Sequence, residues 1–366
     1  MGVRPLGPGL LTATALTLLG LLALHPSLRE PSVWRLGQHG GGDADGSGAE
    51  LTTELALEPQ LPQPQPGTPG ATGHTGLPAA AHLPRMADGR HYPLVPADAA
   101  ATARLLAAVE EALRDGATPA AALPRLGHQQ QVIYRVLAAD PPRAAAVQAL
   151  LPPAWRPVAQ HHLAARRAFL AMHQGSKPLQ QLPAWRIIAP APAAELLAHY
   201  RKAAAATGID WEVLAAINLV ETGMGRIDGV SVANAQGPMQ FLPSTWAEPG
   251  IGRGGNIRDP HDAIQAAARY LVRRGGLRDI RRGLWGYNNS HHYGTAVLHY
   301  AALLRDDPRA YTGLYHWEIH VRSSAGDLWL PVGYQQRQRI PVSRYLEQVP
   351  ASAPPSAPPA SSSRQA

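Results

Sequence analysis

The sequence predicts a mainly α-helical protein with a small β-hairpin near its C-terminus. Three observations support this fold class. Apolar residues recur with helical spacing across residues 91–310, a short stretch near residue 320 alternates apolar and polar residues, and Gly- and Pro-rich segments flank residues 91–349. Residues 91–349 are numerous enough for one helical domain with a small appendage.

The composition narrows the possible partners. The chain has 366 residues, a formal net charge of +7 and no Cys, which excludes disulfides, thiolate metal sites and Cys nucleophiles. An excess of positive charge attracts polyanions, whether nucleic acid, an anionic membrane face or an acidic wall polymer. The basic residues are dispersed, and all except Lys177 and Lys202 are Arg. We therefore expect no nucleic-acid partner.

The N-terminal residues 1–28 read as a membrane anchor or a signal segment. Arg4 precedes an apolar run over residues 6–24, which is long and uniform enough to enter the cytoplasmic membrane. The apolar run ends in Leu24-His25-Pro26-Ser27, which does not have a pair of small residues one and three positions before a possible cleavage point. An uncleaved anchor is therefore favoured. We expect the chain in the cell envelope, at the outer face of the cytoplasmic membrane, with secretion as the alternative.

Two segments have the composition of disordered chain. Residues 29–90 are rich in Gly, Pro, Gln and Thr and should form a linker, and residues 350–366 should form a disordered tail. A fragment without residues 1–90 is therefore expected to be soluble and active.

Residues 91–191 should form a helical N-terminal lobe. Asp98 can cap its first helix and Gly116 can end it, and shorter helices are expected over residues 128–137, 143–150 and 157–173. His161 and His162 are adjacent and so point to different faces of a helix. We expect solvated histidines there rather than a metal site.

The next predicted helices lead to an acid. A helix over residues 193–206 should end at Gly208, and Asp210 should cap a second helix over residues 211–221. This second helix is apolar on nearly all sides and ends in Glu221. Apolar neighbours and the negative end of the helix dipole both raise the pKa of a carboxyl, so Glu221 is a general acid candidate. The alternative is that Glu221 points outward to solvent.

A set of motifs follows in a fixed order over residues 192–305. The set is Glu221-Thr222, Ser231, Ala235-x-Gly237-x-Met239-Gln240, Pro243-x-Thr245, Asp259-Pro260, Asp262-Ala263, Ala266-Ala267, and Gly286-Tyr287-Asn288-Asn289-Ser290 with Tyr293. It resembles the signature of the lysozyme-like lytic transglycosylases of the soluble, actinobacterial type, which cleave peptidoglycan. The resemblance implies an α+β lysozyme-like transglycosylase domain over residues 192–310.

The resemblance also implies roles for single residues. Glu221 matches the sole catalytic acid, which protonates the bond between N-acetylmuramic acid and N-acetylglucosamine and leaves a 1,6-anhydro sugar. Thr222, Ser231, Met239, Gln240, Tyr287 and Asn288 match residues that contact substrate or line the cleft, with Tyr287 as the hydrogen-bonding tyrosine. The family needs no cofactor.

Some positions depart from the family pattern. Thr222 replaces the usual Ser and keeps the hydroxyl, and Asn234 replaces the usual Gly at a position where Asn tolerates left-handed backbone angles. Some relatives have a calcium loop before Asp259. Here residues 252–259 contain one carboxylate and two Arg, so we expect no bound metal.

A few residues near the motifs have open roles. Asp228 could hold a water for hydrolysis, but a turn cap beside Gly229 or a solvent-facing position is favoured. Of His291 and His292, one is expected to line the cleft and the other to be exposed. Trp246 and Trp285 are expected in the core.

The last predicted element is a hairpin in an extension over residues 311–349. Residues 317–322 alternate apolar and polar, residues 323–327 supply a turn, and residues 328–330 begin a second strand.

Three functions remain to be separated. The favoured one is a lytic transglycosylase that acts on wall glycan. The alternatives are a hydrolytic muramidase on the same fold and a non-catalytic scaffold that binds wall glycan.

Overall fold

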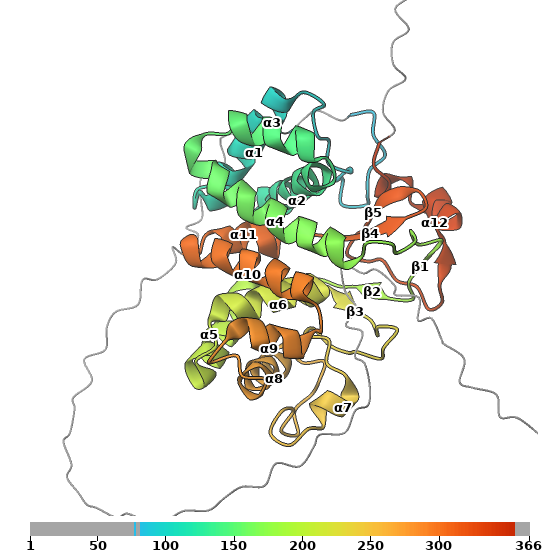
Figure 1. Ribbon diagram of the computed structural model, residues 1–366. Helices are drawn as coiled ribbons and strands as arrows, with labels where there is room; N and C mark the ends of the chain where they lie inside the picture. Colours follow the sequence, from blue (N-terminus) through green and yellow to red (C-terminus); the bar gives the residue numbers. More distant parts are fainter. Residues whose placement is uncertain (1–76, 78–80, 356–366) are drawn as a thin grey trace, which may run out of the picture. The chain divides into compact units, whose positions relative to one another are not determined.

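The computed structural model describes residue 77 and residues 81–355 (Figure 1). The predicted apolar span at residues 6–24, most of the predicted linker and residues 356–366 of the predicted tail lie outside this part. None of the helices in the described part has both the length and the apolarity of a membrane span.

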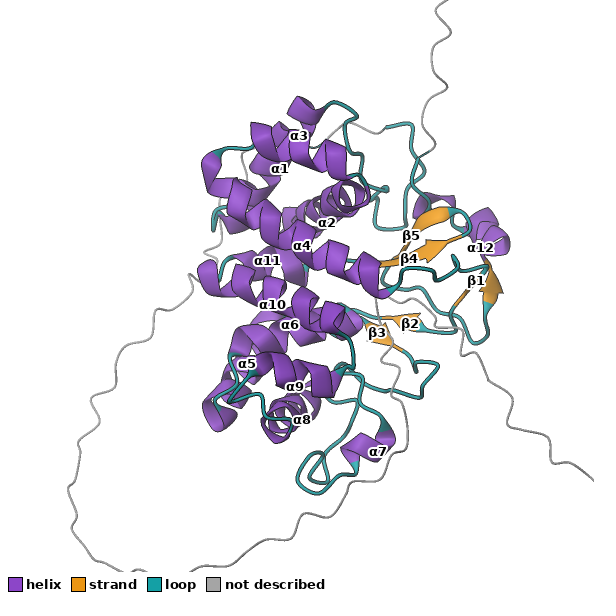
Figure 2. Cartoon of the chain, viewed as in Figure 1, coloured by secondary structure: helices purple, strands orange, loops and turns teal. Residues whose placement is uncertain are grey.

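The described residues are mainly helical, as the sequence predicts (Figure 2). The α-helices are α1 (Ala99–Arg114), α2 (Leu123–Ala139), α3 (Pro141–Leu150), α4 (Arg156–Met172), α5 (Ala193–Thr207), α6 (Trp211–Thr222), α7 (Pro243–Trp246), α8 (Pro260–Arg273), α9 (Ile280–Tyr287), α10 (His291–Asp306), α11 (Ala310–Tyr315) and α12 (Val342–Gln348). The 3-10 helices are η1 (Ala120–Ala122), η2 (Pro153–Trp155) and η3 (Pro350–Ser352).

The strands form three antiparallel pairs within the described residues. The strands are β1 (Gln181–Leu182), β2 (Arg186–Ile187), β3 (Ile227–Asp228), β4 (Ile319–Ser323), β5 (Gly326–Leu330) and β6 (Ile340–Pro341). The pair β4–β5 is the predicted hairpin, and Ser323 is paired with Gly326 at its turn. The pairs β1–β6 and β2–β3 were not expected, because strands of two residues are too short to show an alternating pattern.

Helices α3 and α4 begin and end near the predicted positions, whereas α2 begins at Leu123, five residues before the predicted start at residue 128. Asp98 caps α1 as expected, and its Oδ1 accepts a hydrogen bond of 2.7 Å from the Ala101 amide. The expectation for His162 is wrong, since this side chain is buried and stacks on Tyr134 with ring centroids 4.1 Å apart. The face of α4 that carries His162 packs on α2, and burial lowers the pKa of the imidazole.

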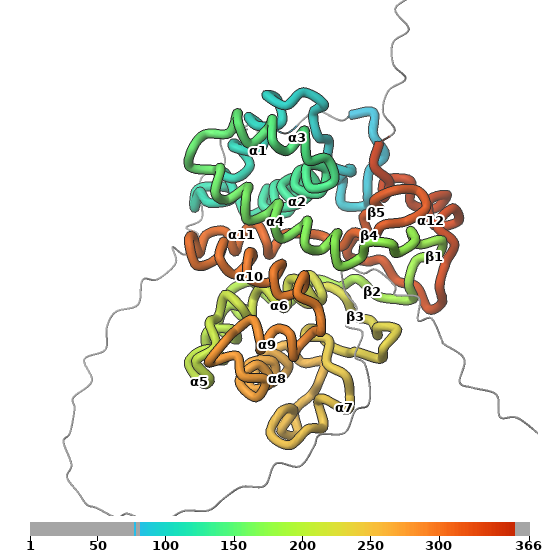
Figure 3. The backbone as a smooth tube through the Cα atoms, viewed as in Figure 1, coloured from blue at the N-terminus to red at the C-terminus, as the bar shows by residue number. Residues whose placement is uncertain are grey.

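The helices before and after residue 191 share one hydrophobic core. Leu106 on α1, Leu163 on α4, Ile217 on α6 and Val297 on α10 all belong to the same buried cluster. Helix α10 lies between α4 and α6 and packs against both (Figure 3). The N-terminal lobe therefore supports the helices that carry the motif residues.

The ends of the folded part differ from the predicted boundaries. Arg90, expected in the linker, places its Nη1 2.6 Å from Oε1 of the buried Glu318. Ala351 and Ser352, expected in the disordered tail, are buried in η3. Both segments were predicted to be disordered from their composition, and composition does not show that single residues of a segment contact the folded part.

Candidate active site

Helix α6 delivers Glu221 to the interior. Gly208 ends α5 in a left-handed conformation (φ 78°), as expected for a C-terminal glycine, and α6 follows as predicted. Every residue of α6 from Val213 onward is buried. The expectation that the Asp210 side chain caps this helix is wrong, because its Oδ2 pairs with Arg305 Nη2 at 3.0 Å instead.

The Glu221 carboxyl is enclosed, with only 4% of the residue exposed. Its Oε1 accepts a hydrogen bond of 2.7 Å from the Tyr293 hydroxyl. Its Oε2 has no partner among the described residues and keeps access to solvent. Burial raises the pKa of Glu221 to about 8, while the hydrogen bond from Tyr293 acts in the opposite direction. The alternative of an outward-pointing carboxyl is therefore wrong.

Two stacked tyrosines lie beside the acid. The rings of Tyr287 and Tyr293 are nearly parallel, with centroids 6.3 Å apart. The Tyr287 hydroxyl donates to the Met239 carbonyl at 2.8 Å, so it does not take the contact with Glu221 that Tyr293 makes. The hydrogen bond from Tyr293 to Glu221 was not predicted from the sequence, although Tyr293 lies shortly after the Tyr-Asn motif.

Thr222 links the end of α6 to the loop over residues 231–241, which carries the Ala-x-Gly-x-Met-Gln motif and is called the motif loop below. Its hydroxyl donates to the Pro238 carbonyl at 2.7 Å and accepts from the Gly225 amide at 3.0 Å. Thr222 and Met239 are both fully buried. These buried side chains hold the loop in place from the inside, and their expected contact with substrate stays a prediction.

The motif loop turns sharply between residues 231 and 241. Asn234, Gly237 and Gln240 all have positive φ angles, of 66°, 72° and 48°. Gly237 tolerates no side chain, because a Cβ would lie 1.8 Å from the Ile257 carbonyl oxygen. The Ser231 hydroxyl accepts from the Ala233 and Ala235 amides, at 3.2 and 3.0 Å.

Gln240 and Asn288 make local hydrogen bonds of different kinds. The side chain of the half-buried Gln240 donates from Nε2 to the Gly237 carbonyl at 3.0 Å. Asn288 is buried directly after α9, where its backbone N–H donates to the Leu284 carbonyl at 2.9 Å.

Asp228 is held by two cations rather than left to solvent or a turn. It lies in β3, where its carboxylate pairs with Arg186 and, at 3.4 Å, with Arg258 Nη1. This arrangement differs from the expected turn cap, because β2 brings Arg186 alongside β3.

One group of side chains in the described residues has spacing suitable for a metal. Ligand atoms of Asp259, His261 and Asp262 lie within 4.8 Å of one another. Two carboxylate oxygens of this group already accept backbone hydrogen bonds, Asp259 Oδ1 from the Asp262 amide and Asp262 Oδ2 from the Asn256 amide.

The surface aromatic residues correct one expectation. Trp285, expected in the core, is 42% exposed, and its ring centroid lies 4.4 Å from that of His291. His291 and His292 are both exposed, and the expectation that one of them lines the cleft stays a prediction. Trp246 is half-buried and packs against the core.

The comparison with protein families agrees with the geometry. Residues 199–295 match the family model of the transglycosylase SLT domain, and this segment contains Glu221, the motif loop and both stacked tyrosines. No curated protein and no solved structure matches the chain. Residues 199–295 are therefore an SLT transglycosylase domain, of the lysozyme-like type that cleaves peptidoglycan.

Proposed function

We propose that the protein is a lytic transglycosylase that uses Glu221 as its single general acid and base. Its substrate is the β-1,4 bond between N-acetylmuramic acid and N-acetylglucosamine in peptidoglycan. The supporting observation is the buried Glu221 carboxyl, whose pKa of about 8 keeps the proton on at neutral pH. A carboxyl that is protonated at neutral pH can act as a general acid.

In this mechanism Glu221 gives up one proton and regains one in each reaction cycle. Glu221 donates it from Oε2 to the glycosidic oxygen, and the bond from that oxygen to C1 of the muramic acid breaks. The carboxylate that remains accepts a hydrogen bond at Oε1 from Tyr293. It then takes the proton of the C6 hydroxyl as that oxygen bonds to C1. The products are a 1,6-anhydro sugar and a free N-acetylglucosamine end, and Glu221 is protonated again.

The environment of Asp228 favours this reaction over hydrolysis. Ordinary glycosidases place two carboxyl groups across the bond, and the second one acts as a nucleophile or activates water. Asp228 is engaged by Arg186 and Arg258, which occupy its oxygens. The sugar's own C6 hydroxyl requires no second protein carboxylate.

We also propose that the enzyme works in the cell envelope, at the outer face of the cytoplasmic membrane. Residues 6–24 support this location as a sequence pattern, and the net charge of +7 favours attraction to an acidic wall polymer.

Muropeptide mass spectrometry tests the reaction and the acid together. Glu221→Gln should release no soluble fragments from purified peptidoglycan, whereas the parent protein should release 1,6-anhydromuramyl products. Glu212→Gln is a matched control, because Glu212 lies in the first turn of the same helix. Cleavage by Glu221→Gln would disprove the role of this acid. Products with reducing ends would indicate a hydrolytic muramidase. Binding to the wall without release of products would indicate a non-catalytic scaffold.

A further inference from the structure

A large cavity lies apart from the catalytic residues. It has a volume of about 850 Å³, is open to solvent on one side, and is lined by α2, α4, the segment before α1, the β4–β5 hairpin, and His82, Pro354 and Pro355 at the two ends of the described part. Glu221, Tyr287 and Tyr293 are not among the residues that line it. Ligand pockets typically measure roughly 300–1,000 Å³, so its size suits a small ligand.

The wall of this cavity is largely apolar. Val95 lies before α1, Val132 and Val136 come from α2, and Phe169 and Leu170 come from α4. A wall of this kind favours an apolar chain over water.

The charged groups of the cavity are arginines with a single acid. The acid is Asp327, whose Oδ2 accepts from Arg135 Nε at 2.7 Å. Two further arginines donate to backbone carbonyls, Arg143 to Pro96 and Arg322 to Ser176. Because four arginines line the cavity against this one acid, the lining keeps a positive charge.

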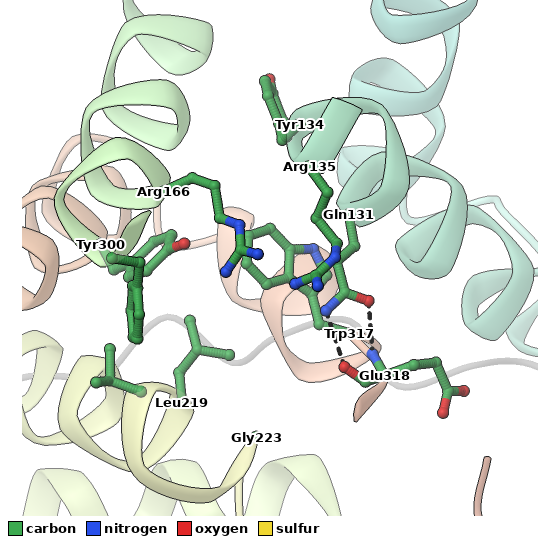
Figure 4. A pocket seen from close by; sticks show the side chains of 11 residues that line it. Gln131, Tyr134, Arg135, Arg166, Leu219, Gly223, Tyr300, Trp317 and Glu318 are labelled. Carbon is green, nitrogen blue, oxygen red and sulfur yellow. Dashed lines mark hydrogen bonds between the residues drawn. The ribbon is translucent and has the colours of Figure 1, made fainter. Parts of the chain in front are cut away.

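Arg166 has no such partner. No described residue accepts a hydrogen bond from its guanidinium, and its Nε is buried without a partner. Burial lowers the pKa of Arg166 to about 10, which still leaves it protonated at neutral pH. The side chains of Arg166 and Arg135 point toward Trp317 in a small neighbouring pocket (Figure 4). Leu219 and Val220 of α6 also line this pocket. Arg166 as a whole is half-buried, so part of its guanidinium remains open to a ligand while Nε is covered. A cation without a protein partner beside an apolar wall is suited to pair with an anion.

We propose that the cavity binds an anionic amphiphile, an apolar chain that ends in a carboxylate or a phosphate. Its acid group pairs with Arg166, and its chain lies against Val132, Val136 and Leu170. The planar guanidinium matches both head groups, since it can donate two parallel hydrogen bonds to either. A fatty acid and a phosphorylated lipid are the two sources of this chemistry.

Calorimetric titration of the full chain tests this proposal with three ten-carbon probes, each below its micelle-forming concentration. The probes are decanoate, decyl phosphate and decanol. We expect at least one acid to bind at least tenfold more tightly than the alcohol, and the better acid identifies the head group. Equal binding of decanol and both acids, or no binding by any probe, would overturn the proposal.

Two variants and one control locate the binding. Arg166→Gln should weaken binding of the acid at least tenfold, and Val136→Trp should also weaken it by narrowing the apolar part of the cavity. Arg167→Gln, an exposed neighbour on α4, should bind as the parent does. Residues 6–24 are identical in all variants, so any alkyl binding there cancels in the comparison. Since Arg166 is unpaired, Arg166→Gln should melt no lower than the parent. Unchanged affinity in Arg166→Gln would overturn the assignment.

Discussion

Glu221 holds its proton at neutral pH because burial disfavours the carboxylate. The folded pKa lies above the ordinary value of 4.5, so the folded state keeps a proton that the unfolded chain releases. The free energy of unfolding should therefore fall as pH rises from about 4.5 to about 8 and stay level above that.

Thermal melting of Glu221→Gln against the parent isolates this contribution, because the buried histidines titrate equally in both proteins. The melting temperature of the variant should rise relative to the parent across that pH window. If the difference in melting temperature between variant and parent stayed constant from pH 4 to pH 9, the pKa of Glu221 would not be raised.

Tyr293 should set the upper pH limit of the reaction. Its hydrogen bond lowers the pKa of Glu221, so Tyr293→Phe should move the basic limb of the pH–rate profile to higher pH. The rate should also fall by about ten- to a hundredfold, since a hydrogen bond to a charged group contributes roughly 1.5–3 kcal/mol.

Tyr287→Phe is the matched control for Tyr293→Phe. It removes a bond to the Met239 carbonyl and should leave the basic limb in place. If Tyr287→Phe shifts the limb and Tyr293→Phe does not, the tyrosine assignment made from the sequence is right after all.

At the scale of elements, Thr222 links α6 to the motif loop. Thr222→Val has the same shape but leaves the Pro238 carbonyl and the Gly225 amide without their partner. An unsatisfied buried group costs about 1–3 kcal/mol, so urea denaturation should show a loss of that size. Thr222→Ser keeps the hydroxyl and should lose less than about 1 kcal/mol. Equal stability of the two variants would show that the hydroxyl has no structural role.

Elements with a long local pattern were predictable from the sequence. The apolar run of α6 and the alternation in β4 repeat over several residues, and both elements appear where expected. The contacts that complete the site depend on chain far away in sequence. The Tyr293 hydroxyl reaches Glu221 from 72 residues away. The ring of His162 is likewise covered by Tyr134 of α2 and by Trp317, which is distant in sequence. A single sequence carries no direct signal for such pairs.

At the scale of the whole folded part, the N-terminal lobe and the SLT domain do not have separate cores. Helix α10 contributes Tyr293 to the site and packs against α4 on its other side. The position of Tyr293 beside Glu221 therefore depends on helices outside residues 199–295. The N-terminal lobe therefore has a structural role in holding Tyr293 beside Glu221.

The N-terminal boundary of a stable fragment follows from Arg90. A fragment of residues 91–355 lacks this cation and leaves the buried Glu318 without its ion-pair partner, although Trp329 Nε1 still donates to Oε2 at 3.3 Å. Breaking a buried pair by removal of one member costs about 3–5 kcal/mol, so this fragment should unfold at lower urea concentration than residues 77–355. Arg90→Met in the longer fragment should reproduce the loss, whereas Arg85→Met, at an exposed position, should not. Equal stability of the two fragments would show that the folded part begins at residue 91, as composition alone suggests.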